Sequence, residues 1–413
     1  MSSLAIRGGT PVRTDPYPEW PEFGDRDAEA VADVVRHGQV GGFPEPGPRA
    51  AEFAERFAAY QGAGHGVVMV NGTVTMEVAL KALGIGWGDE VIVPALTFAA
   101  TAYAAIAAGA LPVIVDVEAE RWTIDSEQVE AAITSRTRAI MPVHLGQQMA
   151  DMDRLAEIAK RHGLAIVEDC AHAHGRRWRD RGAGCIGDFG SFSHQTTKIL
   201  TAGEGGTLLT SDEALARRAH SIIDCGRPKD AAGQETTFGA NYRLSELGAA
   251  LLGSQLDRFE EQRARREQGE LILEELIGEV PGVRLNPVDE RVTRRSFYRY
   301  ILRIDPEAFA GVDNQTVADA LVAEGIGAEV QYPPMSRYDL FQPGKSRLPV
   351  CVEYADRLDP ARMSFPVAES AAERESLYLN ENVFRAGRRG IEDVIEALAK
   401  VQRHADELVP ARV

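Results

Sequence analysis

Short apolar runs alternate with amphipathic segments through the first half of the chain. Apolar runs of this length, bounded by turn residues, are typical of buried strands in a parallel sheet, and they occupy residues 67–70, 91–93, 111–117, 138–145 and 164–171. Helical periodicity fills the intervals, most clearly over residues 152–162, where Gly163 follows as a stop signal. Strands that alternate with helices at this spacing predict an α/β domain with a mostly parallel sheet.

The second half of the chain has a different pattern. Residues 224–240 form a polar stretch that is too long for a plain connection, and such loops are often functional. Residues 241–276 predict one long helical region, apolar at first and then highly charged. We expect a domain boundary inside it, with an N-terminal arm and large domain over residues 1–255. The alternating strands and helices that follow predict a small α+β domain over residues 256–413.

Composition narrows the class of protein. The chain has 413 residues, 44% hydrophobic and 26% charged, which is typical of a globular protein with room for two cores. Its formal net charge of −17 argues against a nucleic-acid-binding surface. Neither a membrane span nor a signal peptide is predicted, so we expect a cytoplasmic location. The cysteines are spaced without a CxxC pair, which favours reduced thiols, and they are Cys170, Cys185, Cys225 and Cys351.

The candidate chemistry centres on residues 166–206. Asp169 lies at the end of an apolar strand, and Lys198 follows about thirty residues later, just before a glycine-rich turn. Such a pair suits a pyridine cofactor held as a Schiff base, in which the lysine forms the imine and the acid keeps the ring nitrogen protonated. Either residue alone is common, since buried acids at strand ends and lysines in solvated loops occur in many proteins.

Two further features gain meaning beside such a cofactor. Thr73 is predicted to cap a helix over residues 74–83, and the free N–H groups of a helix start bind anions. An ordinary capped helix is the alternative interpretation. Phe98 follows the strand at residues 91–93, where an aromatic ring either joins the core or stacks on a planar cofactor, a contact worth about 0.5–1.5 kcal/mol beyond burial.

Taken together, four motifs resemble the DegT/DnrJ/StrS aminotransferases. They are NGTVTMEVALKALGIGWGDEVIVPALTFAATA, EDCAHAHG, K-x₄-GEGG and GANYRLSELGAALLGSQL. The resemblance extends from about residue 15 to 400. It implies a fold-type I enzyme that uses pyridoxal 5′-phosphate, with a seven-stranded, mostly parallel sheet in the large domain and a small α+β domain at the C-terminus.

The resemblance also implies roles for single residues around the cofactor ring. Lys198 would carry the cofactor as a Schiff base, and Asp169 would pair with the pyridinium nitrogen. His172 would lie near the phenolic oxygen, and Phe98 would stack on the ring. Lys198 would then move a proton between the donor Cα and the cofactor during amino transfer.

The phosphate of the cofactor has its own implied contacts. Gly72, Thr73, the Val74 N–H and Ser193 would surround it at the helix start. Asn241 corresponds to a family asparagine that reaches the phosphate of the neighbouring subunit. The resemblance therefore implies a homodimer with shared active sites.

Departures from the family pattern bear on the substrate. In VHLGQQMADMD, Gly146 replaces an aromatic residue and Met149 a proline, and in VQYPPMS, Gln331 replaces a histidine. Together with Trp178 and the CGRPKD run at 225–230, Gly146 favours the branch of cyclitol aminotransferases and 3-amino-5-hydroxybenzoate synthases. We expect transfer from L-glutamine or L-glutamate to a keto-cyclitol or keto-sugar in antibiotic biosynthesis.

Several alternatives remain open. An aromatising dehydratase like 3-amino-5-hydroxybenzoate synthase and an aminotransferase for nucleotide-linked keto-sugars would use the same core residues. A non-enzymatic regulator would be expected to lose Lys198 or Asp169. A metal site at His144, His172 and His174 is weighed against cofactor and core contacts, which are favoured. The basic stretch at residues 176–181 is predicted to be a solvated turn or an interface segment.

Overall fold

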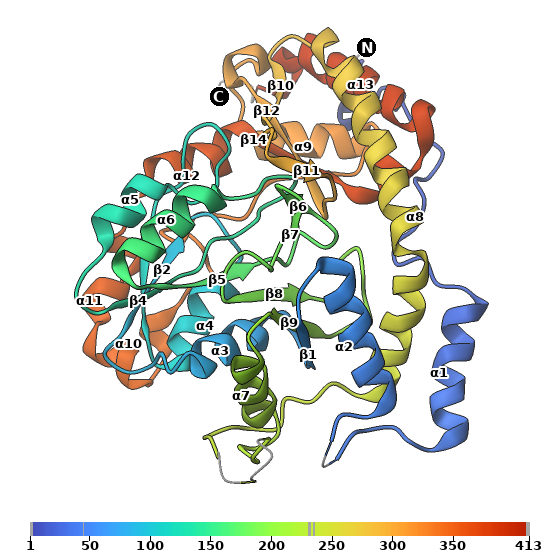
Figure 1. Cartoon of the computed structure of the whole chain (residues 1–413). Coiled ribbons are helices and arrows are strands. Elements are labelled where there is room, and N and C mark those ends of the chain that lie inside the picture. Colours follow the sequence, from blue (N-terminus) through green and yellow to red (C-terminus); the bar gives the residue numbers. More distant parts are fainter. Residues whose placement is uncertain (1–2, 44, 230–232, 234–235, 410–413) are drawn as a thin grey trace.

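A seven-stranded sheet forms the centre of the computed structural model, which describes residues 3–43, 45–229, 233 and 236–409 (Figure 1). Its strand order is β1–β9–β8–β5–β4–β2–β3, and β9 runs antiparallel to both neighbours while the other pairings are parallel. The predicted sheet is confirmed. Its strands are β1 (His65–Met69), β2 (Glu90–Pro94), β3 (Leu111–Val115), β4 (Thr137–Ile140), β5 (Ala165–Asp169), β8 (Phe189–Ser193) and β9 (Gly206–Thr210).

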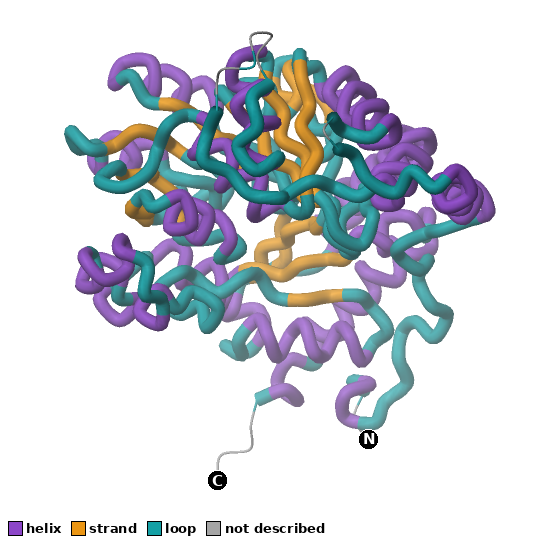
Figure 2. The backbone as a smooth tube through the Cα atoms, turned by 90° about the horizontal axis from the view of Figure 1, so that it is seen from below, coloured by secondary structure: helices purple, strands orange, loops and turns teal. Residues whose placement is uncertain are grey.

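Helices cover both faces of this sheet, because its strands are apolar on both sides. In β2, Val91 and Val93 belong to one apolar cluster and Ile92 to the other. The first cluster includes residues of α3 (Gly72–Ala82), α4 (Ala100–Ala108) and α7 (Glu213–Ile223). The second includes residues of α2 (Pro48–Gln61), α5 (Ser126–Ala132), α6 (Met152–His162) and α8 (Glu246–Leu276). Figure 2 shows the strands inside and the helices around them.

The C-terminal part contains an antiparallel sheet with the order β10–β12–β14–β13. Its strands are β10 (Val283–Leu285), β12 (Arg299–Ile304), β13 (Ala328–Glu329) and β14 (Ser376–Asn380). Helices α9 (Asn314–Ala323) and α13 (Gly387–Arg403) pack on it in a third apolar cluster. This is the small α+β unit that the sequence predicts.

The boundary predicted at residue 255 falls within α8, which is one continuous helix, and it stays a prediction. The N-terminal arm begins on the C-terminal unit, since Leu4 belongs to the third cluster and the Ala5 N–H donates to Glu324. A separate small sheet has the strand order β11–β6–β7. Its strands are β6 (Arg177–Trp178), β7 (Arg181–Gly182) and β11 (Val292–Arg294).

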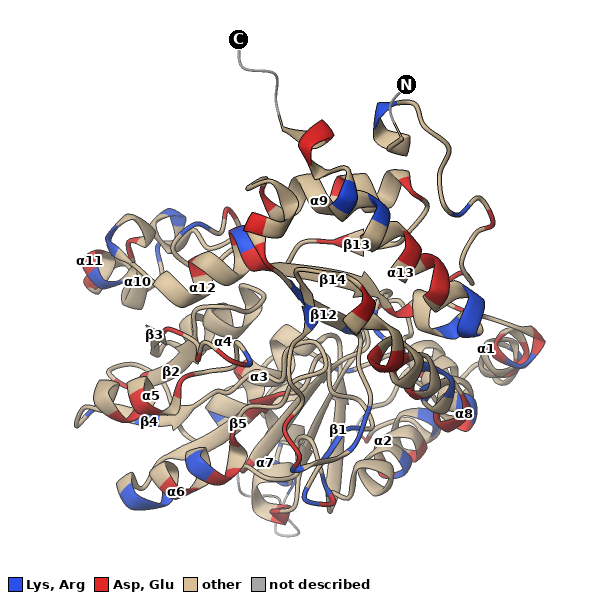
Figure 3. Cartoon of the chain, turned by 90° about the horizontal axis from the view of Figure 1, so that it is seen from above, with Lys and Arg blue, Asp and Glu red and all other residues tan. Residues whose placement is uncertain are grey.

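The remaining helices lie at the periphery. They are α1 (Asp25–His37), α10 (Pro349–Glu353), α11 (Ala355–Leu358), α12 (Pro366–Ser370) and the short turns η1 (Ala5–Arg7), η2 (Ile277–Glu279), η3 (Pro306–Phe309), η4 (Pro343–Lys345), η5 (Pro360–Arg362), η6 (Ala371–Glu375), η7 (Glu381–Arg385) and η8 (Ala405–Leu408). Acidic and basic positions are interspersed along outer helices such as α8 and α13 (Figure 3). Among the described residues, no helix combines the length and apolarity needed to cross a membrane. All four cysteines are free.

Candidate active site

A cavity of about 470 Å³ opens where the strands of the large sheet end. Parallel strands present their carboxyl ends at one edge, and ligands of open α/β sheets bind there. The cavity is lined by seven of the nine residues predicted from the sequence, namely Gly72, Thr73, Phe98, Asp169, His172, Ser193 and Lys198. Phe98 is 45% exposed, so its ring is available to a ligand. Val74 and Asn241 are not among the lining residues.

Lys198 follows β8 through a short turn and points at the ring of Tyr298, with Nζ 4.1 Å from the ring centroid. Burial lowers the pKa of Lys198 to about 7, against the opposing effect of Asp169, and Arg299 lowers it further. A lysine needs its neutral amine to act as a nucleophile, and desolvation is a common way to supply it. The site therefore holds an amine that is partly deprotonated at neutral pH.

Asp169 is the last residue of β5, and it is buried at the end of that strand. Its Oδ2 accepts a hydrogen bond from Thr101 Oγ1 at 2.9 Å, and its Oδ1 accepts one from the Ala171 N–H at 3.1 Å. Burial raises the pKa of Asp169, whereas these two bonds and Lys198 lower it. The carboxylate is thus fixed in direction, and a positive partner in the cavity would stabilise its charge.

His172 has a defined tautomer. Its Nδ1 accepts the Gly146 N–H at 3.2 Å, so in the neutral ring the proton lies on Nε2, which is 3.4 Å from the hydroxyl of Tyr332. Burial lowers the pKa of His172 well below its usual range, and the nearby Lys198 acts in the same direction. The ring also packs on Tyr298, with centroids 4.6 Å apart. His172 is therefore a neutral hydrogen-bond donor facing the cavity.

The start of α3 differs from the prediction. The helix begins at Gly72, and Asn71 rather than Thr73 is its N-cap, because Asn71 Oδ1 accepts the Val74 N–H at 2.9 Å. The predicted cap is wrong by two residues. The Val74 N–H is engaged in capping, whereas the N–H groups of Gly72 and Thr73 have no partner among the described residues. Together with Ser193 they form the cavity wall, in the arrangement of an anion site.

Asn241 lies outside the cavity and is exposed. It follows the polar stretch at 224–240, of which residues 230–232, 234 and 235 lie outside the described part of the chain, including the last residue of the CGRPKD run. Within the described part, Asp224 is paired with Arg227, Lys229 and Arg243. The structure thus brings Asn241 to the surface of the molecule and not to the chain's own cavity.

The departures from the family pattern have separate structural reasons. Gly146 has a φ of +57°, and a Cβ there would lie 2.6 Å from side-chain atoms of Ile301, so an aromatic residue at this position would strain the backbone and displace the Ile301 side chain. Trp178 is buried in β6 and donates from Nε1 to Asp153 Oδ1 at 3.0 Å, away from the cavity. Gln331 is also buried, and its neighbour Tyr332 lines the cavity instead.

Among the site residues that sequence reasoning missed are Thr101, Tyr298, Arg299 and Tyr332. The signals were weak but present. Thr101 follows Phe98 and is the second residue of the alanine-rich helix α4. Tyr332 belongs to the VQYPPMS motif. Arg299 begins β12 of the C-terminal unit and Tyr298 precedes it, and only the folded chain brings both to the cavity, with the Tyr298 ring against Lys198.

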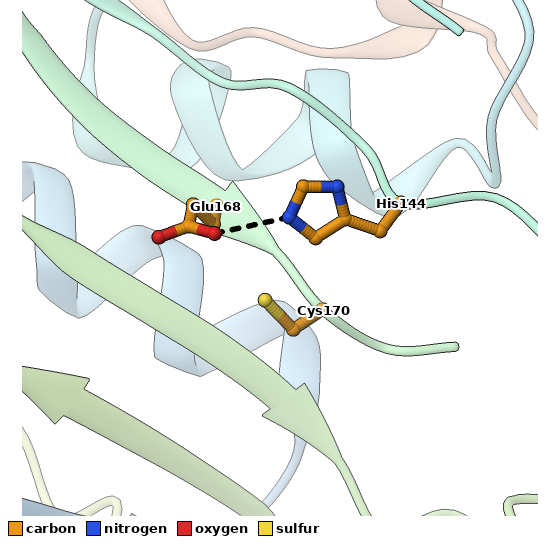
Figure 4. Close-up of side chains that lie close together, drawn as sticks. All are labelled: His144, Glu168 and Cys170. Carbon is orange, nitrogen blue, oxygen red and sulfur yellow. Dashed lines mark hydrogen bonds and ion pairs between the residues drawn. The ribbon is translucent and has the colours of Figure 1, made fainter. Parts of the chain in front are cut away.

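A trio of potential metal ligands lies beneath the cavity, formed by His144, Glu168 and Cys170 (Figure 4). His144 Nδ1 accepts the Ala150 N–H at 3.3 Å, so Nε2 carries the proton that it shares with Glu168 Oε2 at 3.0 Å. Glu168 also accepts three backbone N–H groups, at 2.7–2.9 Å. Burial raises the pKa of the Cys170 thiol well above its usual value. The His144 imidazole and the Glu168 carboxylate are thus already engaged in hydrogen bonds with each other and with the backbone, as in a structural pair.

Arg176 departs from the expectation that residues 176–181 form a solvated turn or an interface segment. It is only 1% exposed, and its guanidinium donates to the carbonyl oxygens of Gln148 at 2.6 Å, Gly146 at 2.5 Å and Ser296 at 2.7 Å. Burial lowers its pKa to about 10. The guanidinium is buried because it donates hydrogen bonds to backbone carbonyl groups near the cavity. Arg176 therefore ties the segments of Gly146 and Ser296 to each other behind His172.

Replacing Arg176 by methionine is expected to lower the free energy of unfolding by about 3–5 kcal/mol, because three buried carbonyl groups lose their donor. Arg177, the next residue, is more exposed and its Nη1 donates weakly, at 3.4 Å, to the Asp180 carbonyl. Arg177→Met should therefore cost less than about 1 kcal/mol. Urea denaturation of the three proteins gives both values, and equal losses for the two variants would contradict this role of Arg176.

Comparison with known proteins identifies the family. Residues 21–383 match the model of the DegT/DnrJ/EryC1/StrS aminotransferase family. A relative from Streptoalloteichus tenebrarius named "Putative L-glutamine:3-amino-2,3-dideoxy-scyllo-inosose aminotransferase" is 43% identical, over 98% of this chain and 99% of the relative. A second protein from that organism, an L-glutamine:2-deoxy-scyllo-inosose aminotransferase, is 39% identical over 98% of this chain and 99% of its own length.

Solved structures agree in fold. The crystal structure of 3-amino-5-hydroxybenzoic acid synthase has a TM-score of 0.81 and 34% identity, and the match covers 94% of this chain and 99% of that one. DesV of S. venezuelae, in complex with a ketimine intermediate, has a TM-score of 0.77 and 33% identity, and the match covers 94% and 95%. The fold of this chain is thus that of these aminotransferase-family structures. The chain belongs to the DegT/DnrJ/EryC1/StrS aminotransferase family.

Proposed function

We propose that this aminotransferase uses pyridoxal 5′-phosphate to move an amino group from L-glutamine to a keto-cyclitol. The observation that carries the proposal is the meeting of Lys198, Asp169 and the start of α3 in one cavity. The names of the two relatives support the donor and the acceptor class. Each relative is named as an aminotransferase that pairs L-glutamine with a scyllo-inosose derivative.

The residues that line the cavity fit both the phosphate and the ring of pyridoxal 5′-phosphate. Two unpartnered N–H groups at the start of α3, with the hydroxyls of Thr73 and Ser193, would hold a phosphate. The approach is close because a Cβ on Gly72 would lie 2.7 Å from the Ser193 Cβ. Asp169 would hold the proton of the ring nitrogen, and Phe98 would cover the ring face. When bound, the cofactor supplies an aldehyde that carries the amino group and a ring that stabilises negative charge at the reacting carbon.

The side chains around it would perform the proton transfers. Lys198 would hold the bound cofactor through its amine. The same amine, once free, would take the proton from the donor Cα and return one on the other side of the transfer. His172 would donate from Nε2 to the phenolic oxygen. Tyr298 packs against both Lys198 and His172, so it limits where the freed amine can move and keeps water from its far side.

The charge of the cavity supports a carbocyclic acceptor. In the described part of the chain, its basic side chains are Lys198 and Arg299, its acidic ones are Asp169 and Glu204, and its neutral hydrogen-bonding groups include Gln195 and Thr197. A nucleotide diphosphate needs a cluster of cations, whereas the hydroxyl groups of a cyclitol need neutral donors and acceptors. This difference favours a keto-cyclitol over a nucleotide-linked keto-sugar.

The test is a reaction of the cofactor-loaded protein with L-glutamine and 2-deoxy-scyllo-inosose, followed by mass spectrometry. The proposal predicts an aminated cyclitol together with the keto acid derived from glutamine. An aromatising dehydratase would instead release water and form a product with ultraviolet absorbance from a suitable amino-ring substrate. Formation of that product, or amination confined to nucleotide-linked sugars, would overturn the cyclitol assignment.

Gly72→Ala is expected to raise the Kd for pyridoxal phosphate about tenfold, because the added Cβ pushes Ser193 away from the helix start and weakens about one charge-assisted hydrogen bond. The Kd for pyridoxal, which has no phosphate, should stay within about twofold. Fluorescence titration of the cofactor-free protein measures both. Gly278→Ala is the control, since a Cβ there meets no atom within 4 Å. Equal weakening of pyridoxal binding would argue against the phosphate site.

We further propose a homodimer in which Asn241 of one copy completes the phosphate site of the other. The exposed position of Asn241, away from its own cavity, supports this arrangement. If it holds, mixing Lys198→Ala protein with Asn241→Ala protein after dissociation will restore activity, because each hybrid dimer has one intact site. Mixtures that stay as inactive as both parents, although hybrids form, would contradict shared sites.

A further inference from the structure

Trp20, in the N-terminal arm, contacts the backbone of the residue on which the proposed chemistry depends. Its indole Nε1–H donates to the carbonyl oxygen of Lys198 at 3.2 Å, although the two residues are 178 positions apart in the sequence. The Lys198 N–H is bonded within its own turn, to the Gln195 carbonyl at 2.8 Å. In the part of the chain that the structure describes, no other donor reaches the Lys198 carbonyl. The arm therefore supplies a hydrogen bond that the turn does not make by itself.

Two buried arginines hold the indole ring of Trp20. The guanidinium carbon of Arg266 lies 5.1 Å from the centroid of the ring, and that of Arg385 lies 5.3 Å from it. Both guanidinium groups pair with Glu381, at 2.6 and 3.0 Å. Nη1 and Nη2 of Arg266 are buried without a hydrogen-bond partner among the described residues, so the electron-rich ring is the group that this charge meets. These contacts fix the direction of the indole N–H.

The arm is also fixed on both sides of Trp20. Arg385 Nη2 donates to the Glu19 carbonyl at 2.9 Å, and its Nη1 pairs with the Glu22 carboxylate at 3.1 Å. Arg258 of α8 donates to the Glu22 carbonyl at 2.6 Å. Neither α8 nor η7, which contains Arg385, supplies any of the described residues that line the active-site cavity. Trp20 is thus placed by a frame that does not depend on the Lys198 turn.

We propose that Trp20 is a positioning residue, which fixes the backbone of Lys198 so that its amine stays where the proton transfer needs it. The inference rests on the proposed aminotransferase function. The amine itself lies over the ring of Tyr298, so Lys198 is held at both its carbonyl and its side chain. A small displacement of a reacting group lowers a rate by up to about 100-fold. The N-terminal arm is therefore a working part of the active site.

The first test uses Trp20→Phe, which keeps an aromatic ring between the two arginines and removes the N–H. Single-turnover rates of the cofactor-loaded protein are measured at increasing concentrations of L-glutamine. The maximal rate should fall about tenfold, as for loss of one hydrogen bond. The half-saturating concentration should stay within about twofold, because Trp20 does not line the cavity.

Trp178→Phe is the matched control for this test. Trp178 also donates its indole N–H, to Asp153 at 3.0 Å, and its ring also meets an arginine, with the guanidinium carbon of Arg291 4.4 Å from the centroid. This variant should keep the rate of the unaltered protein. An unchanged maximal rate in Trp20→Phe, or an equal loss in Trp178→Phe, would overturn the inference.

The second test does not depend on the reaction. Hydrogen exchange with mass spectrometry follows the backbone N–H groups of residues 196–202 in the purified protein, where Thr196 donates to the Gly203 carbonyl and Ala202 to the His194 carbonyl. Trp20→Phe should speed exchange in this segment about tenfold and leave β5 and β8 unchanged, whereas Trp178→Phe should leave this segment unchanged. Unchanged exchange in the segment, or equal acceleration throughout the sheet, would overturn the inference. If the unaltered protein transfers no nitrogen from L-glutamine, the proposed function fails, and the exchange rates still decide whether Trp20 fixes the turn.

Discussion

Replacing Lys198 by alanine is expected to lower the rate of amino transfer at least about 10⁴-fold, the upper range for loss of one general acid–base group. The physical reason is that, under the proposed function, the neutral amine would both attach the cofactor and move the proton at the donor Cα. Burial lowers the pKa of Lys198 to about 7, so a large share of its amine is neutral at neutral pH. The measurement is the single-turnover rate with L-glutamine.

Lys160→Ala is the matched control, because Lys160 is an exposed residue of α6 on the outside of the molecule. It should keep the rate of the unaltered protein. Added methylamine should restore part of the activity of Lys198→Ala, since a small amine can enter the space left by the side chain. A Lys198→Ala protein with more than about one hundredth of the original rate would contradict this role.

Replacing Asp169 by asparagine is expected to lower the rate about 10³-fold, which is comparable to the loss of one preorganised electrostatic partner. Asparagine keeps the size of the side chain: its oxygen can still accept the Ala171 N–H, and its amide N–H can donate to the hydroxyl oxygen of Thr101. It lacks the negative charge that would keep the ring nitrogen protonated. The rate should fall while the Kd for the cofactor changes far less, and Asp319→Asn, at an exposed position on α9, should alter neither.

The same variant has a consequence for pH dependence. Asp169 raises the pKa of Lys198 against the larger effect of burial, so removing its charge lowers that pKa below about 7. In the cofactor-free protein, trace acetylation of Lys198 should be slow at low pH, where the amine is protonated, with a midpoint near pH 7. Asp169→Asn should move the midpoint to lower pH. A midpoint near the ordinary lysine value of roughly 10.4 would contradict the desolvated amine.

The sequence predicts the large sheet and its reacting groups because both leave local signals. A strand buried on both faces is a continuous apolar run, and Asp169 interrupts such a run where β5 ends. The same reasoning could not decide between Asn71 and Thr73 as the cap of α3. Both residues cap helices well, and the choice depends on which side chain reaches the Val74 N–H.

Local sequence patterns could not predict which residues from distant parts of the chain meet at the site. Arg299 lies about one hundred residues after Lys198 and reaches the cavity only because the C-terminal unit folds over the sheet edge. Arg176 stands among exposed arginines, and its burial follows from three backbone carbonyls that carry no sequence signal. Gly146 illustrates the same limit, since the side chain that excludes an aromatic residue there is Ile301.

The most direct test of the whole account is to load the protein with pyridoxal phosphate, reduce it with borohydride and map the modified peptide by mass spectrometry. Reduction fixes the cofactor to the lysine that carries it. The account predicts a single modified residue, Lys198, and no modification when L-glutamine is added in excess before reduction. Modification of another lysine, or none in a protein that binds the cofactor, would contradict the assignment of this cavity as the active site.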